Sequence, residues 1–302
     1  MPDNPRPCLL CLPDEAPVAA RAAAAARMDC QVVEQHHFPD GEVRLRLPPA
    51  LPPRAVLWRS LNQPDPKLVE LLLIAHSARQ AGVQWLGLVA PYLAYMRQDM
   101  AFRPGEVVSQ RVVGGFLAGL FDALLTVDPH LHRVATLSEA VPLRDPGAAV
   151  VLSGAPLLAE LIARHHTDPL LLGPDEESLQ WVASAAAARG WEHAVCTKQR
   201  QGDRQVSIAL PALPLNGRAV VLLDDVASSG HTLAQATRLL RAAGAATVDV
   251  AVTHALFAGD AIDIVKAAGV RHVWSTDCIS HPSNAVSIVP VVAEVLRRWT
   301  SG

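Results

Sequence analysis

The sequence predicts an α/β protein of two domains, each a mostly parallel sheet flanked by helices. Short apolar runs alternate with amphipathic segments along most of the chain, and the alternation starts again near residue 153. This alternation is typical of βαβ units, in which helices cover both faces of a parallel sheet. The chain has 302 residues, enough for two domains of ordinary size. We expect the domains at 1–145 and 146–302.

The expected strands are apolar runs, several of which lack a strict alternation of polar and apolar residues. Such runs indicate parallel strands that are buried on both faces. They lie at 55–60, 85–92, 123–128, 169–173, 219–225 and 247–254. The run CLLCL (8–12) is also interpreted as a strand. Its C-x-x-C spacing would suit a metal or redox site, but the sequence offers no second pair to complete one.

The expected helices have apolar residues at helical spacing. They lie at 66–82, 176–190 and 231–245. The first two end at a glycine, and the third reaches Gly244 at its close, as helix ends commonly do.

Composition excludes several classes of function. Half of the residues are hydrophobic and the net charge is −3, so nucleic acid is not an expected partner. No apolar run reaches the length of a membrane-spanning helix, and the first residues lack the pattern of a signal peptide. The five cysteines are sparse and odd in number. We therefore expect a cytoplasmic protein with reduced thiols and no membrane partner.

The stretch VVLLDDVASSGHT (220–232) has the pattern of a ligand site at the end of a strand. Four apolar residues lead into Asp224 and Asp225, and a turn of small polar residues opens the next helix. The two carboxylates can accept hydrogen bonds from sugar hydroxyls, and a helix N-terminus attracts phosphate. From these residues alone, an acidic turn with a serine helix cap is an equally good interpretation.

This stretch resembles the ribose-5-phosphate-binding motif shared by phosphoribosyltransferases and ribose-phosphate pyrophosphokinases, which implies a phosphoribosyltransferase-like fold for the domains. His231 stands where the motif usually has glycine, and Ser228 also departs from its commonest form. The resemblance implies that Asp224 and Asp225 bind the ribose. It also implies that the 5-phosphate is held by Ser228, Ser229, Gly230, His231 and Thr232.

Two segments of the first half resemble the ATP-binding loops of the pyrophosphokinases in particular. FPDGEVRLRL (38–47) is similar to a loop that reaches the adenine of ATP on a neighbouring subunit. PYLAYMRQDM (91–100) is similar to a segment whose guanidinium fork can clamp phosphates. The ATP-binding residues implied are Phe38, Asp40, Glu42, Arg97, Gln98 and Asp99. Taken alone, the first segment is better interpreted as a solvated hairpin turn, and the alternative for the second is a charged surface loop after a strand.

Three more segments match the family in the right order. In LLTVDPHLHR (124–133) and LLLGPDEESLQWV (170–182), the resemblance implies that His130 and Asp175 bind the Mg²⁺ of the ATP complex. In CTKQRQGDRQV (196–206), it implies that Lys198 and Arg200 are the catalytic cations of a mobile flap. Residues two apart on a strand face the same side, so both charges can reach one phosphate.

The implied reaction is transfer of the diphosphoryl group of ATP to the C1 hydroxyl of ribose 5-phosphate, which gives phosphoribosyl pyrophosphate and AMP. The implied partners are ATP, ribose 5-phosphate and further copies of the chain, because the ATP site is shared between subunits of a homo-oligomer. Two alternatives stay open. A phosphoribosyltransferase would share residues 220–232 without needing the ATP segments, and a non-catalytic regulatory paralogue would bind nucleotide without turnover.

Overall fold

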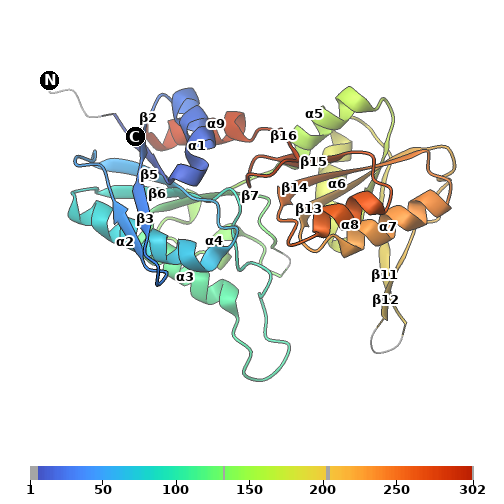
Figure 1. The fold of residues 1–302 in the computed structure, drawn as a ribbon, viewed down its shortest axis with the longest axis horizontal. Coiled ribbons are helices and arrows are strands. Elements are labelled where there is room, and N and C mark those ends of the chain that lie inside the picture. Colours follow the sequence, from blue (N-terminus) through green and yellow to red (C-terminus); the bar gives the residue numbers. More distant parts are fainter. Residues whose placement is uncertain (1–5, 132, 202–204, 301–302) are drawn as a thin grey trace. The chain divides into compact units, whose positions relative to one another are not determined.

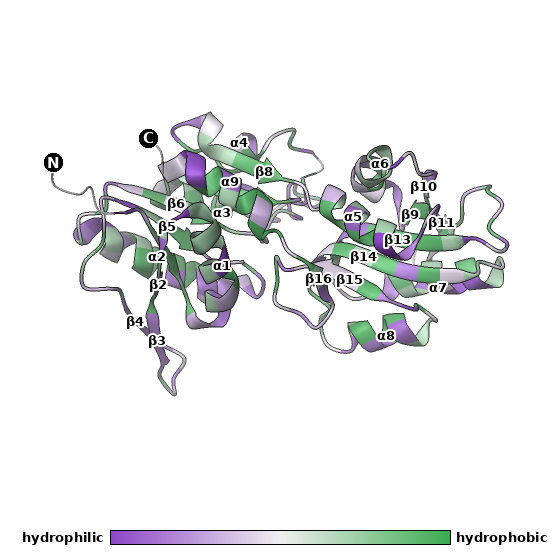
Figure 2. Ribbon diagram, turned by 90° about the horizontal axis from the view of Figure 1, so that it is seen from above, coloured by the Kyte–Doolittle hydropathy of each residue, from purple (hydrophilic) through white to green (hydrophobic). Residues whose placement is uncertain are grey.

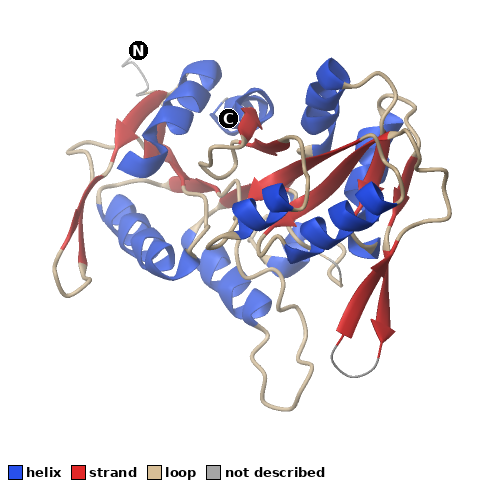
Figure 3. Ribbon diagram, turned by 45° about the vertical axis from the view of Figure 1, so that its right-hand side comes forward, coloured by secondary structure: helices blue, strands red, loops and turns tan. Residues whose placement is uncertain are grey.

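A computed structural model describes residues 6–131, 133–201 and 205–300. It divides into two compact units: unit 1, Met1–Leu152 with Ile288–Gly302, and unit 2, Ser153–Ser287. Each unit has a six-stranded sheet in which every pair of neighbouring strands is parallel, with helices on both faces (Figures 1 and 3). The expected α/β fold class is confirmed.

The unit 1 sheet has the strand order β2-β1-β5-β6-β7-β8. Its strands are β1 (Cys8–Cys11), β2 (Asp29–Val32), β5 (Arg54–Trp58), β6 (Trp85–Val89), β7 (Ala123–Val127) and β8 (Ala149–Leu152). Its helical segments are η1 (Pro13–Glu15), α1 (Ala16–Ala26), α2 (Pro64–Gln80), α3 (Ser109–Leu120), α4 (Leu137–Ala140), η2 (Pro146–Ala148) and α9 (Val289–Thr300).

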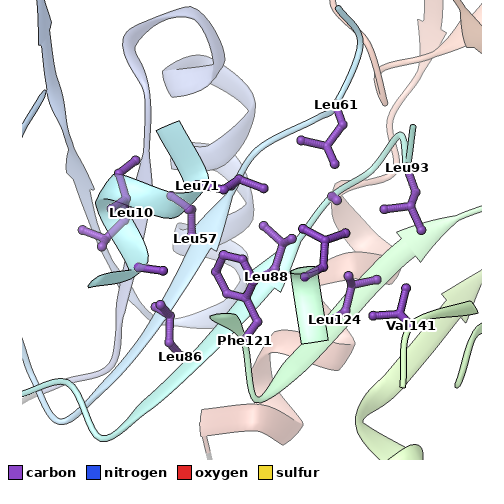
Figure 4. Close-up of a cluster of buried hydrophobic side chains, with 14 of the residues drawn as sticks. Leu10, Leu57, Leu61, Leu71, Leu86, Leu88, Leu93, Phe121, Leu124 and Val141 are labelled. Carbon is purple, nitrogen blue, oxygen red and sulfur yellow. The ribbon is translucent and has the colours of Figure 1, made fainter. Parts of the chain in front are cut away.

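The core of unit 1 lies between the sheet and helices α2 and α3 (Figure 4). Leu57, Leu88 and Leu124 project from three neighbouring strands, and Leu71 meets them from α2. The cysteines of β1 are buried, and this burial raises the pKa of Cys8 and of Cys11 to about 12. Their thiols therefore stay protonated, as expected of a plain strand.

The C-terminal helix α9 belongs to unit 1, although residues 146–302 were expected to form one domain. It packs on α1 through an apolar face, and its Trp299 ring meets Trp85 edge-on with centroids 5.6 Å apart. A Cβ atom on Gly87 would lie 3.1 Å from the Trp299 ring, so this glycine makes room for it. The chain leaves unit 1 at residue 152 and returns to it at 288.

The unit 2 sheet has the order β10-β9-β13-β14-β15-β16. Its strands are β9 (Leu170–Gly173), β10 (His193–Val195), β13 (Ala219–Ala227), β14 (Thr247–Ala255), β15 (Val273–Thr276) and β16 (Asn284–Val286). Its helical segments are α5 (Ala155–His165), η3 (Glu176–Ser178), α6 (Leu179–Ala187), α7 (His231–Ala242) and α8 (Ala261–Ala267).

Both faces of the unit 2 sheet are covered, so its central strands carry continuous apolar runs. On β13, Val220 and Leu222 pack toward α7 and α8, while Val221 and Leu223 pack toward α5 and α6. Figure 2 shows stretches of the hydrophobic colour along the strands of this sheet, interrupted by hydrophilic ones. Two-sided burial removes the alternation that marks a half-exposed strand.

Each unit also carries an antiparallel hairpin apart from its main sheet. Unit 1 has β3 (Glu34–His37) paired with β4 (Val43–Arg46), and unit 2 has β11 (Thr197–Gln201) paired with β12 (Gln205–Ala209). Over the described ranges, no helix combines the length and the apolar character needed to span a membrane.

Candidate active site

The loop 228–230 joins β13 to α7 at the carboxyl edge of the unit 2 sheet (Figure 1). Gly230 has a φ of 72°, and a Cβ atom on it would lie 2.7 Å from the carbonyl oxygen of Ala261. Glycine is therefore required by both the backbone conformation and the close approach of α8. Because glycine has no side chain, residue 230 cannot cap the first-turn N–H groups of α7. An uncapped helix N-terminus suits an anion.

The segment that follows β14 holds this loop through two backbone hydrogen bonds. The N–H of Phe257 donates to the carbonyl oxygen of Ala227 over 2.9 Å, and the N–H of Ala258 donates to that of Ser228 over 3.0 Å. Phe257 itself has a positive φ of 34°. These two hydrogen bonds fix the backbone at the start of the loop, while Ser229 and His231 are exposed.

The two acids near the end of β13 differ in exposure. Asp225 is 2% exposed, whereas Asp224 is half-buried and accepts a hydrogen bond of 3.0 Å from the N–H of Asp225. Burial, and then the charges of Asp225 and Asp175, raise the pKa of Asp224 well above its usual range. Negative charge is therefore concentrated here, and cations or hydroxyl donors would relieve it.

Asp175 lies in the tight turn between β9 and α6. Its Oδ1 accepts from the N–H of Glu177 over 3.0 Å, and its carbonyl oxygen accepts from Ser178 Oγ over 2.6 Å. A Cβ atom on Gly173 would lie 2.1 Å from Ser178 Oγ, so the turn requires glycine at 173. Ser178 is buried, and its hydroxyl group holds this turn in place.

The expected catalytic flap is the β11–β12 hairpin. Lys198 and Arg200 lie two residues apart on β11, and their backbones pair with Ile208 and Val206 of β12. Their side chains fall outside the part of the chain that the structure describes. The hairpin confirms the expected strand, and the roles of the two cations stay predictions.

In unit 1, the segment expected to reach adenine is the tip of the β3–β4 hairpin. The N–H of Phe38 donates to the carbonyl oxygen of Glu42 over 2.8 Å, and the N–H of Glu42 donates to Asp40 Oδ1 over 3.1 Å. Gly41 has a φ of 94°, which closes the turn. The Phe38 ring is 39% exposed, which suits stacking on a base.

The three residues expected to bind ATP after β6 lie in different environments. Arg97 is exposed, and Gln98 Nε2 donates to the carbonyl oxygen of Met100 over 3.0 Å. The side chain of Asp99 is 2% exposed and pairs with Arg133 over 2.7 Å. Asp99 thus ties the loop after β6 to the segment after β7.

His130 follows β7 in the next loop along the same carboxyl edge of unit 1. Asp128, two residues earlier, is buried and has a positive φ of 37°, an unusual backbone conformation for a residue other than glycine. Its N–H donates to the carbonyl oxygen of Leu152 over 2.9 Å. Strained residues of this kind concentrate at functional sites.

The expected metal ligands belong to different units: His130 to unit 1 and Asp175 to unit 2. Among the described residues, no three His, Cys, Asp or Glu side chains converge closely enough to hold a metal ion. Unit 2 does bring Asp175 into electrostatic contact with Asp224. Mg²⁺ commonly binds through one or two carboxylates together with waters and substrate phosphates, so this arrangement is compatible with it.

Sequence reasoning missed two features of these loops. Arg133 holds Asp99 across 34 residues, and no local pattern indicates such a pair. Asp128 lies in the segment LLTVDPHLHR (124–133), which the sequence analysis singled out for His130. No sequence pattern indicates that its backbone has a positive φ.

Comparisons with known proteins agree with this geometry. The model of the N-terminal domain of ribose phosphate pyrophosphokinase matches residues 8–120, and that of the phosphoribosyl transferase domain matches residues 151–289. The ribose-phosphate pyrophosphokinase of Methanopyrus kandleri is 37% identical over 276 residues, covering 90% of this chain and 93% of that protein. That of Halobacterium salinarum is 36% identical over 283 residues, covering 92% and 96%.

One solved structure shares the fold over the whole length. The phosphoribosylpyrophosphate synthetase from Mycobacterium smegmatis superposes with a TM-score of 0.84 at 22% identity, covering 98% of this chain and 100% of that one. Both halves of the chain match the two domain models in order, and the relatives are matched over nearly their full length. The chain therefore belongs to the ribose-phosphate pyrophosphokinase family.

Proposed function

We propose that this enzyme transfers the diphosphoryl group of ATP to the C1 hydroxyl of ribose 5-phosphate, giving phosphoribosyl pyrophosphate and AMP. The observation that carries the proposal is the site at the end of β13. There, Asp224 lies among other acids, and Gly230 leads into an uncapped helix N-terminus. One side of this site suits the hydroxyls of a sugar, and the other suits a phosphate.

In this proposal, Asp224 and Asp225 bind the ribose. Asp224 makes the direct contact, because Asp225 is almost fully buried and acts through its charge and its backbone. The 5-phosphate lies against the helix N-terminus, with Ser228, Ser229, Gly230, His231 and Thr232 around it. His231 in place of glycine adds an imidazole beside the phosphate.

ATP binds through the loops of unit 1. Phe38 stacks on the adenine while Asp40 and Glu42 accept from its amino group, and Arg97 and Gln98 hold the phosphates. Asp99 contributes by holding Arg133, which joins the loop after β6 to the segment after β7. The hairpin tip serves the site of a neighbouring copy, so the active enzyme is a homo-oligomer. We place it in the cytoplasm.

The proposed metal is Mg²⁺, held near His130 and Asp175. Its charge would offset the negative charge of the phosphates and of the acids that raise the pKa of Asp224. Lys198 and Arg200 stabilise the negative charge that develops on the transferred group and on the departing AMP. The enzyme thus works mainly by alignment and by neutralisation of charge.

The test is to incubate the protein with ATP, Mg²⁺ and ribose 5-phosphate, and to follow AMP and phosphoribosyl pyrophosphate by chromatography. We expect the two products in equal amounts, and almost none from a Lys198→Ala variant. A phosphoribosyltransferase would instead consume phosphoribosyl pyrophosphate without ATP. A regulatory protein would bind nucleotide tightly and release no AMP, which would refute the proposal.

A further inference from the structure

Unit 1 contains a cluster of charges, buried except for Asp14, that the proposed reaction does not use. Arg59 follows β5 and is 3% exposed. Its guanidinium contacts three carboxylates: Asp14 at 2.7 Å, Glu15 at 2.9 Å and Glu70 at 2.7 Å. Burial opposes the charge of Arg59, but the three acids outweigh it and raise its pKa. This Arg59 cluster joins η1, the end of β5 and α2.

Glu70 connects the cluster to the β3–β4 hairpin. Its Oε2 accepts from Arg59 Nε over 2.8 Å, and its Oε1 accepts from Gln35 Nε2 over 2.6 Å. Both carboxylate oxygens are therefore engaged, and the side chain is 3% exposed. Gln35 thus donates to an acceptor whose position is already fixed by a buried ion pair.

Gln35 is well placed to fix the direction of the hairpin. Along β3, Gln35 is half-buried and its neighbours are exposed. Its partner in the pairing register is Leu45 of β4, which packs against the unit 1 core. One apolar contact and one hydrogen bond from the same register position therefore attach the hairpin to the body of the unit. A hydrogen bond restricts direction, whereas an apolar contact alone does not.

We propose that Gln35 is a positioning residue for the nucleobase: its hydrogen bond to Glu70 sets the direction in which the hairpin presents Phe38 to ATP. This inference rests on the proposed function, in which the tip binds adenine. Phe38 is three residues from Gln35 along the chain, so a small rotation about the Gln35 contact displaces the ring.

The first test compares two neighbouring truncations on β3. Gln35→Ala should raise KM for ATP by about tenfold, as expected when a hydrogen bond to a charged group is lost. KM for ribose 5-phosphate should not change, because that site lies on unit 2. Glu34→Ala is the matched control, since it removes only an exposed pair with Arg46 of 3.3 Å on the same hairpin. Its KM values should be those of the parent.

The second test exchanges the two polar groups. Gln35→Glu alone places two carboxylates together and should raise KM for ATP further than Gln35→Ala does. The double variant Gln35→Glu with Glu70→Gln again pairs one amide with one carboxylate, and should recover most of the affinity for ATP. A purely structural role of Gln35 would lower the melting temperature without this pattern of loss and rescue.

The outcomes separate the inference from the function on which it rests. If the parent forms AMP and Gln35→Ala keeps its KM for ATP, the positioning role is wrong and the proposed function stands. An equal rise of both KM values would also overturn it. Absence of AMP from the parent refutes the function. Equilibrium dialysis with ATP then tests the positioning role directly. If the parent and Gln35→Ala bind ATP with the same affinity, the positioning role is excluded.

Discussion

Two groups of acidic side chains lie at the carboxyl edges of the two sheets, and they differ in what surrounds them. In the Arg59 cluster, three carboxylates surround one guanidinium and each of them contacts it. In unit 2, Asp224 lies near Asp225 and Asp175, and its main electrostatic neighbours carry the same charge. Every acid of the first group contacts a cation, whereas the main electrostatic neighbours of Asp224 in the second are further acids.

The difference indicates which group is structural and which binds a ligand. A buried charge is tolerated when its partners are in contact with it. Like charges held together cost stability unless something else compensates, and substrates or metal ions are the usual compensation at active sites. The Arg59 cluster therefore contributes to the stability of unit 1, and Asp224 contributes to binding at the expense of stability.

The largest expected effect is at Asp224, where one substitution should weaken substrate binding and increase stability. Asp224→Asn should lower kcat/KM for ribose 5-phosphate by about a thousandfold, as loss of a charged group at a reacting centre typically does. The same change should raise the melting temperature of the ligand-free protein by about 2 °C, because it removes a carboxylate whose charge is disfavoured by burial and by the charges of Asp225 and Asp175. Steady-state kinetics and calorimetry measure the two effects.

An exposed acid on α8 provides the control for this variant. Asp263→Asn should leave both quantities unchanged. A fall in melting temperature for Asp224→Asn would contradict the interpretation of the unit 2 acids as an unbalanced group.

The next largest effect concerns the Arg59 cluster. Arg59→Met removes the guanidinium and leaves Asp14, Glu15 and Glu70 facing one another. We expect the free energy of unfolding to fall by about 3–5 kcal/mol, the range found when one partner of a buried ion pair is removed. Urea unfolding measures it. Arg46→Met, which removes an exposed pair with Glu34, should cost less than about 1 kcal/mol.

The pH dependence of stability gives a smaller and distinctive effect. The pKa of Asp224 is higher in the folded protein than in the unfolded chain, so the folded state favours the protonated form. Its contribution to stability is complete below the unfolded value, about pH 4, and is lost as pH rises through the raised pKa. The melting-temperature difference between Asp224→Asn and the parent should therefore grow with pH. A constant difference would contradict this.

The smallest expected effect concerns the Asp99–Arg133 ion pair, which joins the loop after β6 to the segment after β7. Arg133→Ala should raise KM for ATP by about threefold, as expected for loss of a half-exposed ion pair that only positions the loop. KM for ribose 5-phosphate should stay constant. Arg144→Ala, which removes an exposed cation from the same unit, is the comparison in the same kinetic assay.

Much of the fold could be predicted because the central strands of each sheet are buried on both faces. The run 219–225 became the start of β13, and 85–92 contained β6, because helices on both sides require apolar side chains at successive positions. The packing of α9 on unit 1 could not be predicted. A helical pattern shows that one face is buried, but it does not show which sheet the helix covers.

In the candidate site, too, local features could be predicted and long-range contacts could not. Asp224 and Gly230 were predictable because a strand end, an acid pair and a glycine before a helix are local signals. The pair Asp99–Arg133 and the bond Gln35–Glu70 link residues more than thirty positions apart. Such contacts depend on how elements pack, so sequence reasoning did not identify Gln35 or Arg133, and the ATP-binding role of Asp99 stays a prediction.

The return of α9 to unit 1 makes unit 2 an insertion within the chain of unit 1. During synthesis, all of residues 153–287 are made before the last helix of unit 1 emerges. At about 5–20 residues per second, this interval is on the order of ten seconds. During this interval, the surface of α1 that packs against the apolar face of α9 lacks its partner helix. The second unit to be translated is thus the first that can complete its fold.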